Sequence, residues 1–141
     1  MDTAHALADL TEISPQIEAA VVFDAAGSVE GSTLDDEERS RELARLAKLL
    51  LDEAASARSA GAGSLTQLQA ELRAGSVFLV REGERSIAAT TSEEPTVGLV
   101  FYDLRSCLRS LSRDGGAEAP TQGDEAPVAG ADEPKEGDEA A

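Results

Sequence analysis

Apolar residues in the first part of the chain switch from a helical to a strand spacing. Three of them recur every three residues on one helix face: Leu7, Leu10 and Ile13. Ser14-Pro15 ends this helix because the residue before a proline avoids helical torsion angles. Two short apolar runs follow at 17–23 and 28–33, joined by a turn in which Gly27 supplies the positive φ. The chain is therefore predicted to begin with a short helix and a β-hairpin.

A long helix is predicted from residue 35 to residue 61. It opens with four acids that suit the positive end of the helix dipole, and Gly61 closes it. The centre of its apolar stripe consists of Leu43, Leu46, Leu50, Ala54 and Ala57, flanked by Leu49, Leu51 and Ala44. The stripe spans about 220°, whereas a helix lying on one sheet needs only about 100°. We therefore expect this helix to contact its own sheet and also a second copy of itself or a partner.

Three consecutive strands are predicted next, at 64–75, 76–83 and 84–92. The first of them has a helical alternative, because Leu65, Leu68 and Leu72 also suit a helical period.

A last helix is predicted from residue 96 to about residue 113, with apolar residues on one face only. These residues are Val97, Val100, Phe101, Leu104, Leu108 and Leu111. The predicted order is α-β-β-α-β-β-β-α, which is an α+β fold with antiparallel strands.

The composition divides the chain into one domain, 1–113, and an acidic tail, 114–141. The tail has no aromatic residue, one valine as its only branched aliphatic residue and three of the five prolines, so we expect it to be disordered. It holds 9 of the 28 acidic residues and 1 of the 12 lysines and arginines, which is −8 of the net charge of −16. Residues 1–113 carry the other −8.

This negative charge argues against several classes of partner. Phosphate backbones and anionic lipid surfaces would be repelled, so we expect neither nucleic-acid binding nor membrane insertion. We find no signal peptide and no long apolar run. The single cysteine, Cys107, cannot form an internal disulfide, which fits a reducing compartment. We therefore expect a cytoplasmic protein whose partners are other proteins.

Few residues suit catalysis or metal binding. His5 is the only histidine, and none of the common nucleotide-binding, hydrolase or metal motifs is found. Cys107 lies at the margin of the last helix's apolar stripe, where a small core residue needs no chemical role. We therefore predict no enzymatic activity, no catalytic residues, no metal and no cofactor.

Charged residues on the back of the long helix form the most informative polar pattern. We call Arg41, Arg45, Lys48 and Asp52 the docking ridge; with Glu38 they follow three- and four-residue spacing. Two interpretations remain open. The ridge is either an ordinary solvated face, with Glu38–Arg41 and Lys48–Asp52 pairs, or a surface where a partner docks.

Several segments together resemble the Roadblock/LC7 family in its bacterial, MglB-like form. They are the sequence AAVVFDAAGSVEGSTL at 19–34, the long Ala/Leu-rich helix and VGLV at 97–100. Within the first segment, Asp24 and Gly27 precede a second strand that ends in small residues and Thr33. The resemblance extends over nearly all of residues 3–113.

The resemblance implies a five-stranded antiparallel sheet between helices, with the first and last helices on one face and the long helix on the other. It also implies a homodimer in which the long helices pack side by side and the third strands pair. The corresponding interface residues here are Leu43, Leu46, Leu50, Ala54 and Leu68. The segment from Leu65 to Arg73, which also suits a helical period, would then be the edge strand that pairs.

In function, the resemblance implies a platform for a Ras-like small GTPase. Such a platform can act by holding the switch loops, and it needs no catalytic residue of its own. Arg41 and Arg45 are therefore interpreted as docking residues only. Two alternatives stay open: a dimeric adaptor in a signalling assembly without nucleotide-dependent contact, and a small-ligand-sensing module. The acidic tail lies outside the resemblance. It is either a solubilising extension or a segment that competes for a basic surface on the partner or tethers the dimer.

Overall fold

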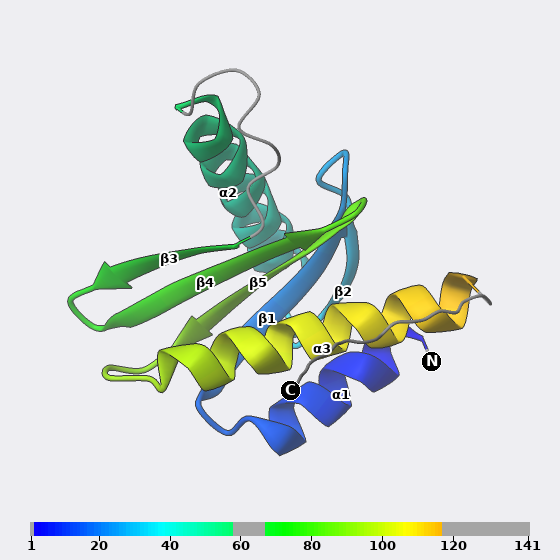
Figure 1. Ribbon diagram of the computed structural model, residues 1–141, viewed down its shortest axis with the longest axis horizontal. Coiled ribbons are helices and arrows are strands. Elements are labelled where there is room, and N and C mark those ends of the chain that lie inside the picture. Colours follow the sequence, from blue (N-terminus) through cyan, green and yellow to red (C-terminus); the bar gives the residue numbers. More distant parts are fainter. Residues whose placement is uncertain (1, 58–66, 117–141) are drawn as a thin grey trace, which may run out of the picture. The chain divides into compact units, whose positions relative to one another are not determined.

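The computed structural model describes residues 2–57 and 67–116 (Figure 1). The predicted element order is confirmed. The elements are α1 (Thr3–Ile13), β1 (Ile17–Asp24), β2 (Val29–Ser32), α2 (Glu37–Ser56), β3 (Gln67–Leu72), β4 (Gly75–Glu82), β5 (Arg85–Thr91) and α3 (Val97–Gly116). The expected tail began at residue 114, but residues 114–116 are the end of α3. The rest of that tail, 117–141, and the predicted end of the long helix at Gly61 lie outside the described residues.

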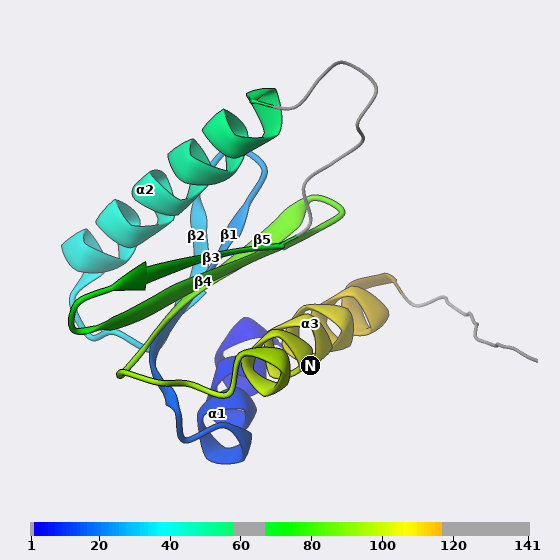
Figure 2. The same cartoon turned by 60° about the vertical axis from the view of Figure 1, so that its left-hand side comes forward.

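The five strands form one antiparallel sheet in the order β2-β1-β5-β4-β3. The β1–β2 hairpin and the β3-β4-β5 meander join where β1 pairs with β5, with Val22 opposite Ile87 at the middle of the pairing. The segment with a helical alternative is therefore a strand, and it lies at one edge of the sheet. Helices α1 and α3 cover one face, and α2 covers the other (Figure 2).

Two hydrophobic cores lie on the two faces of the sheet. The side chains of β1 alternate between them, because Ala20 and Val22 face α1 and α3 while Val21 and Phe23 face α2. On the first face, the Phe78 and Phe101 rings meet edge to face, with centroids 5.0 Å apart. Central strands buried on both faces explain why β1 is apolar almost without interruption.

The β1–β2 turn is built by the Asp24 side chain. Its Oδ1 accepts hydrogen bonds from the backbone N–H groups of Ala26 and Ser28, at 3.0 and 2.9 Å. Gly27 has φ of +90°, so the positive φ predicted for this position is confirmed. Past β2, the Thr33 hydroxyl accepts a hydrogen bond from the Ala20 N–H at 2.9 Å, which ties the end of the hairpin to β1.

The face of α2 that packs on the sheet is not the centre of the predicted stripe. It consists of Ser40, Ala44, Ala47 and Leu51, which are all buried. Three leucines that the sequence placed at or next to the centre are exposed instead: Leu46 by 47%, Leu49 by 51% and Leu50 by 40%. Three of these four buried residues are small and let the helix approach the sheet closely, whereas Leu46, Leu49 and Leu50 turn outward.

Two further predicted core positions are wrong. Ile13 is 68% exposed, because the buried face of α1 continues from Ala6 and Leu10 to Ser14. Val97 is 39% exposed at the first position of α3, one turn before the helix reaches the core at Val100. The other predicted positions of α3, from Val100 to Leu111, are buried.

Among the described helices, none is both long enough and apolar enough to cross a membrane.

Gly75 offers a test of the close packing between β4 and β5. A Cβ atom at this position would overlap the backbone oxygen of Thr91, which cannot move without breaking the sheet. We expect Gly75→Ala to lower the free energy of unfolding by about 2 kcal/mol, measured by urea denaturation. Gly98→Ala is the matched control, because nothing lies within 4 Å of a Cβ there. Equal stability of the two variants would show that the packing at Gly75 is looser than described.

Candidate functional site

The docking ridge divides into two parts in the structure. At the N-terminal part of α2, Arg41 lies 3.7 Å from Glu37 and Arg45 lies 3.1 Å from Glu42, measured between guanidinium nitrogen and carboxylate oxygen. All four side chains are more than half exposed, and such pairs contribute only about 0.3–0.5 kcal/mol. The Glu38–Arg41 pair suggested by the spacing is replaced by Glu37–Arg41. Both arginines can therefore exchange these weak contacts for a partner's carboxylates.

The second part of the ridge ties α2 to the sheet. The Lys48 ammonium donates to one oxygen of Asp52 at 2.8 Å, as the spacing predicts, and the Arg81 guanidinium of β4 donates to the other at 3.1 Å. The hydrogen bond from Lys48 has the largest effect on Asp52 and the one from Arg81 the next largest. Together they hold the pKa of Asp52 below its ordinary value. Lys48 and Asp52 thus have a structural role within the chain, which distinguishes them from Arg41 and Arg45.

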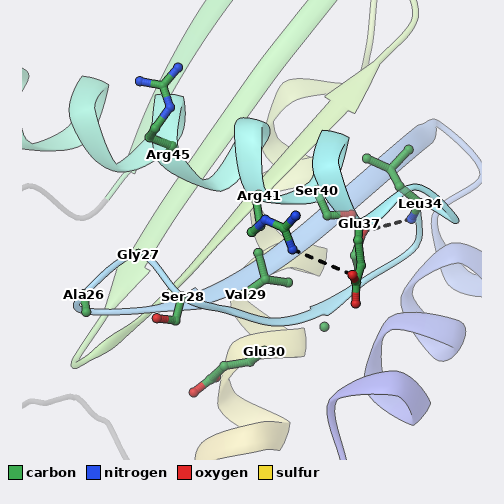
Figure 3. Close-up of a pocket in the computed structure, with 12 residues that line it drawn as sticks. Ala26, Gly27, Ser28, Val29, Glu30, Leu34, Glu37, Ser40, Arg41 and Arg45 are labelled. Carbon is green, nitrogen blue, oxygen red and sulfur yellow. Dashed lines mark hydrogen bonds and ion pairs between the residues drawn. The ribbon is translucent and has the colours of Figure 1, made fainter.

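A hollow of about 630 Å³ lies between the β1–β2 hairpin and the first turns of α2. Arg41 and Arg45 line this hollow from successive turns of the helix, and Val29 lines it from the strand side. The Arg41 side chain lies toward Glu37, whereas that of Arg45 extends away from the hairpin (Figure 3). The hairpin turn also reaches the ridge, since a Cβ at Gly27 would stand 3.0 Å from Cδ of Lys48. The predicted hairpin and the predicted ridge therefore form one surface.

Two serines at this surface were missed by sequence reasoning. The hydroxyls of Ser32 on β2 and Ser40 on α2 lie 2.7 Å apart, and the Leu34 N–H donates to the Ser32 hydroxyl at 2.9 Å. Ser40 is buried, and its own hydroxyl also donates to the backbone oxygen of Asp36. The available signal was a serine four residues before Ala44, on the face of small residues that packs against the sheet.

The predicted interface residues lie on α2 and on β3. Leu46 and Leu50 are exposed, and with Leu49 they form an apolar strip on α2 that we call the leucine strip. Leu43 and Leu68 are half-buried and pack against the core beneath α2, and Ala54 is half-buried. The sheet order leaves β3 with a single neighbour, β4, among the described strands. An exposed leucine strip and a sheet edge are therefore available to a second molecule.

The described residues offer little for catalysis. No group of three or more His, Cys, Asp or Glu side chains within 2–57 and 67–116 is placed to hold a metal ion. Cys107 is buried. This burial, and to a smaller extent the nearby charge of Asp9, raises the pKa of its thiol to about 11. A thiol that stays protonated at neutral pH is a poor nucleophile.

Several solved structures share this fold. A Roadblock/LC7 domain from Streptomyces avermitilis matches 84% of this chain and 100% of its own, with a TM-score of 0.74 and 21% sequence identity. Myxococcus xanthus MglB matches 82% of this chain and 96% of its own, with a TM-score of 0.70 and 14% identity. An MglB structure with a tetrameric arrangement matches 80% and 87%, with a TM-score of 0.69 and 12% identity. At these identities the likeness establishes the fold.

The sequence itself carries the family assignment. No curated protein sequence matches the chain. The family model described as the Roadblock/LC7 domain matches residues 4–92, which extend from α1 to the end of β5 and include both the hairpin and the leucine strip. With the family's sequence pattern and its fold both present, the chain belongs to the Roadblock/LC7 domain family.

Proposed function

We propose that this protein is a non-enzymatic, homodimeric regulator or scaffold of a Ras-like small GTPase. The observation that carries the proposal is the outer surface of α2, which presents exposed leucines together with weakly paired arginines. Family membership and the likeness to MglB support the same conclusion. The proposed site of action is the cytoplasm.

The leucine strip supports dimer formation. Large exposed apolar patches on a soluble domain commonly mark a protein interface. In a two-fold dimer the same patch contacts itself, so the strip on one α2 helix would pack against the strip on the other. The free edge of β3 would extend the sheet into the second subunit, as the family resemblance implies. A solved MglB relative has a tetrameric arrangement, which supports self-association as a property of this fold.

The arginines of the docking ridge would contact the GTPase. Arg41 and Arg45 lie on α2 beside the hollow, and their carboxylate partners are exposed residues of the same helix. Exchanging such partners for a GTPase's acidic groups costs little. The regulator would act by holding the switch loops in one conformation, because phosphoryl transfer depends on positioning and charge stabilisation.

The dimer is tested by Leu50→Glu. A carboxylate in an apolar interface loses its hydration without gaining a partner, so we expect the mass in solution to fall from that of two 14.6 kDa chains to that of one. Size-exclusion chromatography with light scattering measures this mass, and circular dichroism checks folding. Leu99→Glu is the matched control, since Leu99 is 49% exposed on α3, away from the leucine strip. A folded, fully dimeric Leu50→Glu protein would rule out the α2 interface.

The partner is tested with purified Ras-like GTPases from the source organism. Each GTPase is loaded with GDP or with a non-hydrolysable GTP analogue, and binding to the immobilised full chain is measured by biolayer interferometry. We expect tighter binding in one nucleotide state. Equal binding in both states would favour the adaptor function, and no binding to any of them would contradict the proposal.

The docking ridge is tested by the double variant Arg41→Ala and Arg45→Ala. We expect it to weaken GTPase binding by about tenfold, roughly 1.4 kcal/mol, and to reduce the salt dependence of association. Arg109→Ala is the control, because Arg109 is also largely exposed but lies on α3. Equal affinity of the double variant and the wild-type chain would show that the ridge is an ordinary solvated face.

A further inference from the structure

Helices α1 and α3 lie on the opposite side of the sheet from α2 (Figure 2). A second, smaller hollow lies between these two helices. Its volume is about 110 Å³. Its polar lining consists of Asp9 on α1 and of Asp103, Ser106 and Ser110 on α3. Two carboxylates and two hydroxyls thus line one small space between helices.

Asp103 is unusual among the acids that the structure describes because it is buried. The residue is only 7% exposed, and its Oδ2 atom accepts no hydrogen bond from any described residue. None of the ion pairs among the described residues includes it. Burying a carboxylate without a donor is unfavourable, so buried carboxylates normally have a partner. The missing partner is the first indication that this hollow receives a ligand.

The charge of the hollow is negative. Asp9 adds a second carboxylate, and its only ion-pair contact among the described residues is His5, at 3.9 Å. Cys107 also lines the hollow, and its thiol stays protonated because burial and the Asp9 charge raise its pKa to about 11. Among the residues whose side chains the structure describes, none with a positive charge lines the space. A ligand for this hollow would therefore be cationic.

The lining suits an organic cation better than a metal ion. Within residues 2–57 and 67–116, no three His, Cys, Asp or Glu side chains are grouped as metal ligands. The rim, by contrast, includes Ile13, which is 68% exposed, so apolar and anionic groups lie side by side. Basic side chains have this combination, with an apolar stem and a charged head.

We propose that the hollow between α1 and α3 binds a basic side chain of a partner protein, arginine in preference to lysine. The guanidinium would donate to Asp103 and Asp9, while its aliphatic stem would contact Ile13. Arginine is favoured because its planar group is more weakly hydrated than an ammonium and donates two parallel hydrogen bonds to a carboxylate. The net charge of −16 would attract a basic partner over a longer range. This site is separate from the α2 surface and does not depend on the proposed GTPase function.

The test uses N-acetyl-arginine amide as the probe, titrated into the ¹⁵N-labelled full chain and followed by NMR. We expect saturable shifts at the amides of Asp9 and of residues 103–110. N-acetyl-citrulline amide, which has the same shape without the charge, should leave these amides unmoved. Potassium chloride and magnesium chloride at the same concentrations should leave them unmoved as well. Equal shifts with citrulline, or with either salt, would overturn the proposal.

Asp103→Asn removes the buried charge while keeping the shape of the side chain. We expect it to weaken arginine binding by about tenfold, with an equal or higher melting temperature, because an unpaired buried charge is lost. Glu12→Gln is the matched control: it removes the same charge from α1 at an exposed position that does not line the hollow, and it should keep the affinity.

Two outcomes would contradict this role of Asp103. Unchanged arginine binding by the folded Asp103→Asn protein would place the ligand elsewhere. A lower melting temperature would show that the fold itself uses the carboxylate. If Asp103→Asn does not fold, Asp9→Asn tests the same site from the other helix. We expect this variant to weaken arginine binding. Unchanged binding by Asp9→Asn would also overturn the proposal.

Discussion

The antiparallel pairing of β1 with β5 holds the whole domain together. It joins the N-terminal hairpin to the β3-β4-β5 meander, two units that are separated in sequence by the long helix α2. Both strands are buried on both faces, so the same pairing also supports the two hydrophobic cores. The proposed partner surfaces on α1, α2 and α3 therefore lie on helices that pack against these central strands, and the free edge of β3 belongs to the same sheet.

Close packing of α2 on the sheet decides which of its residues are available to other molecules. Alanines 44 and 47 face the sheet, where they allow a close approach, and leucines 46, 49 and 50 face outward. The Lys48–Asp52–Arg81 interaction and the Ser32–Ser40 contact fix the helix at two points along its length. A rigid helix with exposed leucines and arginines suits a platform function, because the docking residues are held in place before a partner arrives.

The two faces of the domain differ in their chemistry. The α2 side presents arginines and leucines, and the α1–α3 side presents a hollow lined by two carboxylates. This arrangement would let one molecule contact two partners of different charge at once. Sequence reasoning identified the arginines because helical spacing reveals a row of charges on one element. It missed the carboxylates because Asp9 and Asp103 are far apart in sequence, and only the packing of two helices brings them together.

The sequence by itself determined the order of the elements, the β1–β2 turn and the family. It could do so because the hydrophobic period, the glycine in the turn and the proline after the first helix all reflect local backbone geometry. It also determined that α2 has more apolar surface than one sheet can cover. Only the tertiary structure decided which part of that surface is buried, leaving Leu46 and Leu50 outside and Ala44 and Leu51 inside. The same holds for Ile13 and Val97, which are apolar but exposed at helix ends. Burial depends on how closely neighbouring elements approach, and no local pattern encodes that distance.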